Sequence, residues 1–326
     1  MGVGEVIGTI ILACIFMVVG VFIGTAIVMP FQGALVRLVD RLRANYNPKG
    51  VGLESGLDSR VGPTLNTLWG TMSRTKRIEG WKGLYKGAIP NVIFSAIVSI
   101  ASIVFVGASA TRGPKGSYTV PEAGGIRMGI FTVFMTLVTL PMTVIINRCI
   151  ITPYALPFDA RQSLRLILTP DEYNKPWTLY LAPGLLTVSG LHVVWVTVIS
   201  RSIKALLVGS VAIDAYDRPG SFIVFLLFQF GSAFLLTPLE VITTRLSIQR
   251  NSDSPYSLSS QNDGGALPDG VQYAGADEDV IGLRPETEPY AGALDAARTI
   301  IEEEGKEALF RAWWVTAIGL LGSAFS

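Results

Sequence analysis

The chain has 326 residues, of which half are hydrophobic and only 16% are charged, and its mean hydropathy is +0.47. Soluble domains carry roughly 25% charged residues, so this composition excludes an ordinary water-soluble protein and indicates a membrane protein. The net charge of +1 excludes the basic surface expected for a nucleic-acid partner. Cys14 and Cys149 lie in or beside apolar runs and show no disulfide, zinc or haem spacing.

Six runs without Asp, Glu, Lys or Arg follow one another along the chain. They are residues 6–36, 88–111, 128–147, 179–200, 221–239 and 312–326. The first five have about the ~20 residues that a helix needs to cross a bilayer. The sixth rises only about 22 Å, short of the ~30 Å apolar thickness, so we expect it to be truncated or to span incompletely. The sequence therefore predicts an all-α membrane protein with six transmembrane helices.

Polar segments after the first, third and fifth runs hold most of the Lys and Arg. These segments are 37–86, 148–178 and 245–311, and both termini are expected on the opposite, less basic side. Residues 292–303 have helical spacing, and 64–76 and 160–168 are the expected counterparts. We predict three short amphipathic helices on the membrane face, each between an odd and an even span.

Each odd-numbered run contains a proline near its polar end. The residue two positions after the proline is polar, and the residue seven positions after it is an arginine. The three sets are Pro30, Gln32 and Arg37; Pro141, Thr143 and Arg148; and Pro238, Glu240 and Arg245. Proline removes a backbone donor and bends a helix, so this recurrence predicts three repeats, each opened by a kinked apolar helix.

A second recurring element stands just before the even runs. Residues 79–87 read EGWKGLYKG and residues 304–312 read EGKEALFRA, whereas the middle of the chain keeps only Leu179 and Tyr180. The prolines and these two boxes resemble the motifs of the mitochondrial carrier family over nearly the whole chain. The resemblance implies three pseudo-symmetric repeats, residues 1–111, 112–210 and 211–326. Each repeat would carry a short surface helix, and the third an acidic insertion at 251–289 and a short last helix.

The resemblance also implies a function and a location. A carrier is a monomeric, multi-pass protein of the mitochondrial inner membrane that moves a small metabolite by alternating access, without a cofactor. Membrane lipids, cardiolipin among them, would bind the boxes from Gly80 to Gly87 and from Gly305 to Ala312. The alternative is a carrier-fold protein without transport activity, which acts as a scaffold in membrane dynamics or protein insertion, with the outer membrane as its location. We find no nucleophile–base pair, metal cluster or phosphate loop, so an enzyme is not expected.

The charged gate of the family is degenerate here. A carrier pairs an acid two positions after each proline with a base five positions after the next proline. Only Glu240 keeps its charge, because the base positions hold Leu35, Ile146 and Thr243. We expect this matrix-side latch to be mostly absent or rebuilt from the three arginines. The simpler expectations are that the arginines contact lipid headgroups, and that Glu240 pairs with Arg245 or Arg148.

The resemblance places substrate contacts midway along the even helices. These positions hold Phe94, Gly190, Leu191, His192 and Gly319. His192 is the single histidine and the only titratable candidate at this depth, and intramembrane ionisable groups are functional candidates. The alternative is a histidine that packs between helices and bonds to Ser or Thr. The insertion 251–289 is poor in apolar residues, which predicts disorder.

Overall fold

The computed structural model describes residues 3–39, 67–109, 111–112, 118–119, 126–209, 219–250, 272–275, 280–281 and 289–324, and most of the chain is helical. Within these ranges five segments are long and apolar enough to cross a membrane. They are Ile15–Val39, Gly80–Phe105, Gly129–Ile151, Leu185–Leu207 and Pro219–Ile248. Helices long and apolar enough to span therefore stand at five of the six predicted spans. The last predicted run holds α13 (Trp313–Ala324), whose 12 residues rise only about 18 Å.

The long helices follow the charge-free runs closely. They are α1 (Val3–Val39), α4 (Ala88–Ser109), α5 (Ile126–Ile151), α8 (Leu185–Val194), α9 (Ser200–Leu207) and α11 (Pro219–Ile248). A π-helical turn, η3 (Trp195–Ile199), joins α8 to α9 in one continuous rod. The sequence did not predict this turn. π-Turns inside α-helices are frequent near functional sites.

Short elements connect the long helices. They are α2 (Leu68–Ile78), α3 (Gly80–Leu84), α6 (Ala160–Ile167), α7 (Pro170–Asn174), α12 (Ala293–Glu304), the 3-10 helices η2 (Pro176–Leu181) and η4 (Lys306–Phe310), and a small hairpin of β1 (Thr111–Arg112) and β2 (Tyr118–Thr119). Helices α2, α6 and α12 stand at the three places where short helices were predicted. Side-chain caps start the first two helices: Thr67 accepts from the Gly70 amide, and Asp159 accepts from the Arg161 amide.

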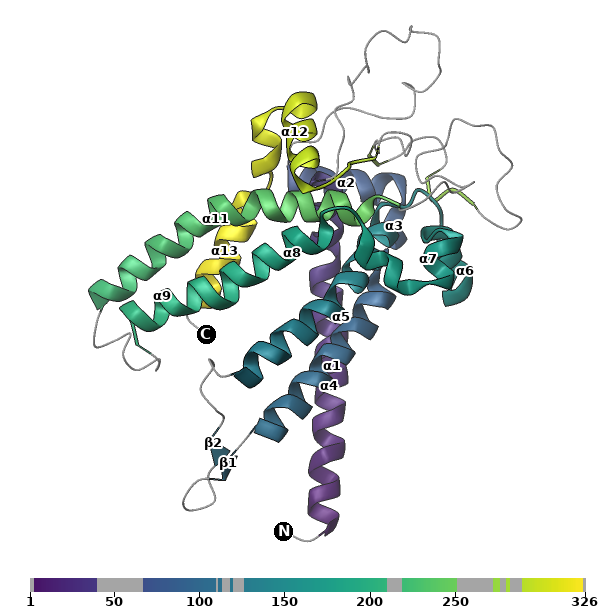
Figure 1. Cartoon of the computed structure of the whole chain (residues 1–326). Coiled ribbons are helices and arrows are strands. Elements are labelled where there is room, and N and C mark those ends of the chain that lie inside the picture. The colour runs from purple at the N-terminus through teal and green to yellow at the C-terminus, as the bar shows by residue number, and fades with distance from the viewer. Residues whose placement is uncertain are drawn as a thin grey trace, which may run out of the picture.

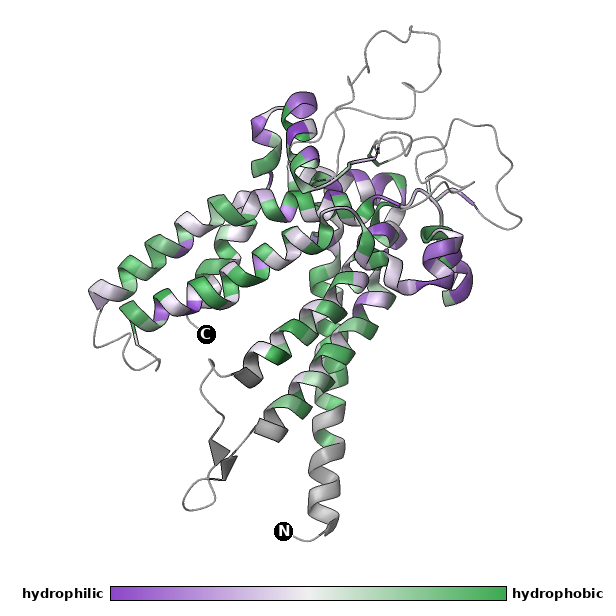
Figure 2. Ribbon diagram, viewed as in Figure 1, coloured by the Kyte–Doolittle hydropathy of each residue, from purple (hydrophilic) through white to green (hydrophobic). Residues whose placement is uncertain are grey.

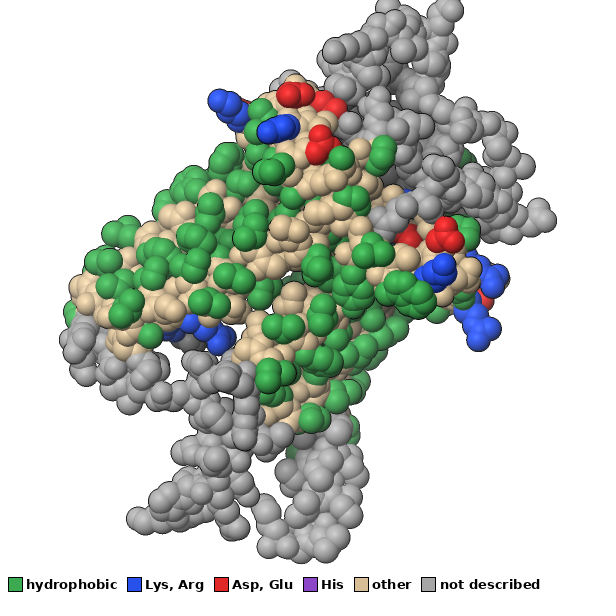
Figure 3. Space-filling view, in the orientation of Figure 1, with side chains coloured by type: hydrophobic (Ala, Val, Ile, Leu, Met, Phe, Trp, Pro, Cys, Tyr) green, Lys and Arg blue, Asp and Glu red, His purple; other side chains and the backbone are tan. Residues whose placement is uncertain are grey.

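The long helices form two groups that meet at one end and spread apart toward the other (Figure 1). Helices α1, α4 and α5 pack together, and α8, α9 and α13 pack along α11. The short helices α2, α3 and α12 gather where the groups meet. Apolar residues run along the long helices, whereas polar residues concentrate on the short ones (Figure 2). In the space-filling view the outer surface of the long helices is largely apolar (Figure 3). This pattern is typical of a protein surrounded by lipid.

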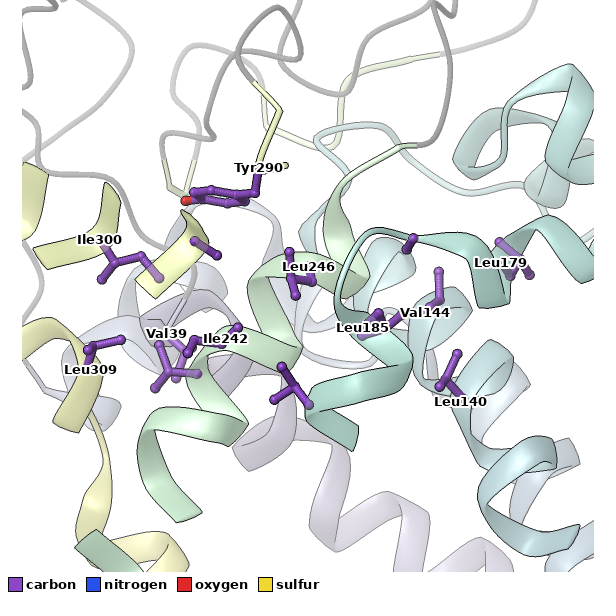
Figure 4. Close-up of a cluster of buried hydrophobic side chains, with 14 of the residues drawn as sticks. Val39, Leu140, Val144, Leu179, Leu185, Ile242, Leu246, Tyr290, Ile300 and Leu309 are labelled. Carbon is purple, nitrogen blue, oxygen red and sulfur yellow. The ribbon is translucent and has the colours of Figure 1, made fainter. Parts of the chain in front are cut away.

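The largest hydrophobic core lies where the two groups meet (Figure 4). Val39 of α1, Val144 of α5 and Leu246 of α11 are buried there, with Leu185 at the start of α8 and Ile300 of α12. This core joins elements from the beginning, middle and end of the chain. Burial of apolar area in this region therefore holds the convergent ends together, while the opposite ends are free to spread.

Part of the insertion for which we predicted disorder is ordered. The amide of Ala155 donates to the carbonyl of Gln272, and that of Ala274 to Pro153, both at 2.8 Å. Further on, two apolar residues are 7% exposed and pack in a core that includes residues of α1 and α5. These are Val280 and Ile281, and Arg74 of α2 donates to the Val280 carbonyl at 3.1 Å.

We call the described residues 272–275 and 280–281 the strap. The prediction of disorder is wrong for the strap, and the remainder of 251–288 lies outside the described residues. The prediction rested on average composition, which does not register a single apolar pair. Two adjacent apolar side chains are enough to seat a short segment when a core with room for them lies nearby.

Candidate functional site

The three arginines that follow the prolines lie at the convergent end and are almost fully buried. Each arginine donates to a backbone carbonyl on another proline-containing helix. The acceptor residue always lies nine positions after the proline of that helix. The bonds are Arg37 Nη2 to Ile150 O (2.8 Å), Arg148 Nε to Ser247 O (3.2 Å) and Arg245 Nη2 to Val39 O (2.9 Å). Helix α1 thus binds α5, α5 binds α11, and α11 binds α1. We call this closed set of contacts the arginine ring.

The chemistry of a helix end explains why arginine suits these positions. The last carbonyls of a helix have no partner within the helix and carry the negative end of its dipole. A guanidinium has five donors and a charge of the opposite sign. Arg148 uses four of these donors, because its Nη2 donates to the Gln249 carbonyl at 2.6 Å in addition to the bonds to Ser247 and to Glu172. The ring therefore satisfies polar groups that neither lipid nor a hydrophobic core could satisfy.

Each arginine of the ring is also paired with a buried glutamate. The pairs are Arg37 with Glu79 (2.6 Å), Arg148 with Glu172 (2.6 Å) and Arg245 with Glu304 (2.5 Å). Charges buried in a low dielectric are tolerated only when they are paired and their remaining donors and acceptors are bonded. Glu172 meets this condition by accepting from both terminal nitrogens of Arg148 and from the Thr169 amide. The ring is thus electrostatically compensated.

Two of the three glutamates bind a second cation. Lys86 Nζ lies 2.7 Å from Glu79 and donates to the Thr152 carbonyl, also at 2.7 Å. Arg311 Nη2 lies 2.6 Å from Glu304. Lys86 and Arg311 occupy the same position, the eighth, in the two recurring boxes, and both are turned into the protein rather than outward.

The tyrosines of the boxes compensate for the prolines. Pro141 has no amide hydrogen, so the Leu137 carbonyl, four residues earlier, loses its helical partner. The Tyr180 hydroxyl donates to this carbonyl at 2.6 Å. Tyr85 does the same for α1, donating at 3.2 Å to Ala26, four residues before Pro30. In a membrane, such side-chain donors are what makes a proline inside a helix tolerable.

The third proline-containing helix differs in this respect. Phe310 occupies the box position that Tyr85 and Tyr180 occupy elsewhere, and its ring has no hydroxyl. It therefore cannot donate to the Phe234 carbonyl, four residues before Pro238. The α11 helix thus lacks the tyrosine bond that supports α1 and α5 at the corresponding level.

A cavity of about 630 Å³ lies between the two helix groups. Helices α1, α5, α8, α11 and α13 contribute to its wall, as do η3 and the residues just before α13. Its polar lining consists of Gln32, Thr132, Thr136, Thr139, Thr143, Asn147, Ser189, His192, Thr197, Thr237, Glu240, Thr243, Thr244, Ser247, Arg311 and Thr316. Such a concentration of hydroxyl and amide groups is unusual among apolar helices. The volume of the cavity suits a small-molecule site.

Threonine spacing explains how α5 supplies so much of this wall. Thr132, Thr136, Thr139 and Thr143 are separated by four, three and four positions. Residues spaced in this way share one face of a helix. Residues on the other side, such as Val133 and Leu137, are exposed to the surroundings of the protein. The helix is therefore amphipathic, with its threonine face toward the cavity and its apolar face outward. It has this character although its only charged residue before Arg148 is Arg127, at its start.

Glu240 and His192 are in contact in the cavity wall. Glu240 Oε1 lies 3.2 Å from His192 Nε2, and Oε2 accepts from the Thr316 hydroxyl at 2.5 Å. The Glu240 side chain is 45% exposed, in contrast to the buried glutamates of the ring. The contact joins α8, α11 and α13 across the cavity wall. His192 is therefore bonded to a carboxylate, not to the Ser or Thr side chain considered from the sequence.

The structure sorts the predicted site residues into three groups. The residues at the second position after each proline all line the cavity; they are Gln32, Thr143 and Glu240. The arginines at the seventh position after each proline form the ring. Of the five predicted substrate contacts, His192 lines the cavity. The other four, Phe94, Gly190, Leu191 and Gly319, are not among its lining residues; Phe94 packs in a core beside α5 and Leu191 is 55% exposed.

Two simpler expectations are wrong. The arginines do not contact lipid headgroups, since their exposed fractions are 1–3% and each is paired with a glutamate. Glu240 pairs with neither Arg245 nor Arg148, because both arginines are bonded to other glutamates. The physical reason is the same in both cases: a buried guanidinium is stabilised more by a helix terminus and a buried carboxylate than by one partly exposed acid.

Sequence reasoning missed Glu172 and the threonine face of α5. Residues 169–172 read TPDE, a capping box with proline at the first helical position, and both of its reciprocal bonds are present. This motif could have identified α7 and placed Glu172 at its first turn. The four-three-four threonine spacing was also visible in the third charge-free run.

The five apolar helices define a multi-pass membrane protein. A scan against protein-family models and a search of curated proteins both find no match for the chain.

Proposed function

We propose that the protein is a transporter that moves a small polar solute across a membrane by alternating access of the cavity. The observation that carries this proposal is a cavity of about 630 Å³ whose lining includes hydroxyl, amide and carboxylate side chains, within a set of helices whose outer surface is largely apolar on the face shown in Figure 3. Polar side chains inside a membrane are costly, and they usually face a water-filled or substrate-filled space. A cavity lined in this way by five helices is suited to binding a solute that lipid would exclude.

We further propose that the architecture is that of a divergent mitochondrial carrier with three repeats. The support is the shared register of the ring, in which the arginine seven positions after one proline binds the carbonyl nine positions after the next. In this proposal the ring replaces the missing acid–base latch and closes one end of the cavity. The mitochondrial inner membrane, a monomeric state and lipid contacts at the two boxes remain predictions that accompany the architecture.

Alternating access requires that the closed end can open. Transport needs two conformations of similar free energy, each with its own contacts. The ring is suited to this purpose, because its contacts between neighbouring helices are hydrogen bonds to backbone carbonyls. Each arginine can keep its glutamate, which lies in the same third of the chain, while it releases the carbonyl of the neighbouring helix. Opening would then leave no buried charge without a partner.

The experiment is flux through purified protein in liposomes, with a cavity-filling variant. Thr139→Phe places a large ring in the cavity wall, whereas Val133→Phe places the same ring on the outer, exposed side of α5. We expect uptake to be lost in Thr139→Phe and unchanged in Val133→Phe. Size-exclusion chromatography should show that both variants are folded. Equal uptake by the two variants would place the solute path elsewhere.

A second candidate, a scaffold without transport, is favoured by one specific observation. The part of α1 from Ile15 to Val28 is exposed on nearly all sides. An uncovered apolar helix is available to another membrane protein. The absence of flux for every solute class, from protein that folds normally and binds no solute, would favour this candidate.

A further inference from the structure

Several hydroxyl groups of the cavity are placed to act as acceptors. On α5, Thr136, Thr139 and Thr143 each donate to the carbonyl four residues earlier in the helix, at 2.7–2.9 Å. On the facing wall, Thr197 and Thr244 do the same. A hydroxyl has a single hydrogen to donate, so these groups offer a bound solute only their oxygen lone pairs. These hydroxyls therefore favour a solute that donates hydrogen bonds.

The charged residues of the lining also favour a solute that donates hydrogen bonds. Glu240 is the one carboxylate among the described lining residues, and its only ion-pair contact in the described chain is with His192. Arg311, the one arginine in the lining, lies against Glu304. A carboxylate accepts about four hydrogen bonds, and the printed geometry uses one on each oxygen of Glu240. Each oxygen therefore retains capacity for a further donor.

We infer that the solute of the proposed transporter is an organic cation with N–H donors, an ammonium or guanidinium compound, whose charged group binds Glu240. The inference depends on the proposed function and specifies the substrate class of the same cavity. A carboxylate with unused acceptors binds a cation that also donates hydrogen bonds more strongly than a neutral donor. The arrangement reverses the usual requirement of an anion carrier, which needs Lys or Arg at this depth.

The remaining lining sets the size and shape of the solute. Leu35, Val36 and Leu140 contribute apolar surface beside the polar face. A short alkyl chain would contact this surface while its amine binds Glu240. His192 and Thr316 hold the carboxylate from two other helices, so we assign both as positioning residues for Glu240.

A series of four-carbon probes tests the charge preference. Labelled 1,4-diaminobutane, 4-aminobutanoate and butanedioate have the same chain and differ only in their end groups. With purified full-length protein in liposomes, we expect 1,4-diaminobutane to be taken up, and butanedioate to be excluded. Glu240→Gln keeps the size of the side chain and removes its charge. We expect it to reduce uptake of 1,4-diaminobutane on the order of tenfold to a hundredfold, as for the loss of one charge-assisted hydrogen bond.

The matched control is Glu302→Gln, which removes one negative charge from the exposed side of α12. We expect it to transport like the unmodified protein. Uptake of butanedioate without uptake of 1,4-diaminobutane would overturn the inference and leave transport intact. Binding of 1,4-diaminobutane that depends on Glu240, measured calorimetrically in the absence of any flux, would support the cation site and contradict transport. If 1,4-diaminobutane is neither bound nor taken up, the inference is overturned.

Discussion

The arginine ring and the cavity each contain glutamate, but the surroundings of the glutamate differ in the two regions. Glu172 in the ring is fully buried and accepts two bonds from Arg148 and one from a backbone amide. Glu240 in the cavity is 45% exposed and has no Lys or Arg partner within the described residues. The ring carboxylates are buried and each is paired with an arginine of the protein itself, so they stabilise the fold. Glu240 is left with unused acceptors, so it is available to a ligand.

This difference separates the structural role of a charge from its functional role. Both regions lie on helices that contain a proline, and Glu240 is only five positions before Arg245. Proximity in sequence therefore says little about the environment of a charge. The number of partners around each carboxylate decides whether a substitution affects stability or ligand binding, and the predictions below are ordered accordingly.

The largest expected effect is from breaking the ring. Arg148→Leu leaves Glu172 buried without its cation and frees the carbonyls of Ser247 and Gln249. We expect a loss of about 3–5 kcal/mol in the free energy of unfolding, measured by thermal or denaturant unfolding in detergent. The double substitution with Glu172→Leu should be less destabilising than Arg148→Leu alone, because no unpaired buried charge remains.

The control for the ring is Arg161→Leu, which removes an exposed arginine from α6. We expect its effect to stay within about 0.5 kcal/mol. If Arg148→Leu were no more destabilising than Arg161→Leu, the ring would not stabilise the convergent end.

A smaller effect is expected from the strap. Ile281→Ala removes buried methyl groups from the core that includes Met29 and Ile150. We expect a loss of about 2 kcal/mol, at the low end for such a truncation because the residue retains some exposure. Leu294→Ala, on the exposed side of α12, is the control and should have little effect. Equal unfolding midpoints for the two variants would show that the strap does not contribute to stability.

The tyrosine bonds to the proline-containing helices come next. Tyr180→Phe keeps the ring and deletes the hydroxyl that satisfies the Leu137 carbonyl, so we expect a loss of about 1 kcal/mol. Tyr85→Phe should cost less, because its bond of 3.2 Å is longer than the 2.6 Å bond of Tyr180. Differential scanning fluorimetry of both variants would measure this order. A larger effect of Tyr85→Phe would contradict the assignment.

The smallest expected effect on stability is that of Glu240→Gln. Because Glu240 is partly exposed and has few partners, we expect its unfolding free energy to change by less than about 0.5 kcal/mol. Glu172→Gln, the matching substitution in the ring, should cost several times more, because Arg148 would lose its counter-charge. Similar losses in both variants, measured in parallel unfolding experiments, would remove the distinction between the two regions.

The sequence by itself determined the membrane class, five of the spans and the places of the three short helices. These features depend on local properties: the length of an apolar run, the spacing of apolar residues and the capping residues beside them. The recurring prolines and arginines were also visible in the sequence, and so was His192 as a candidate within the membrane.

Only the tertiary structure decided what these residues contact. The acceptor of each ring arginine lies about 100 to 200 residues away in the chain, and no local pattern specifies such a partner. The same is true of Glu240, whose neighbours His192 and Thr316 come from different helices. The charge of a residue is a property of its side chain, but its compensation depends on the groups that folding brings around it. For this reason the arginines became structural and one glutamate remained open to a ligand.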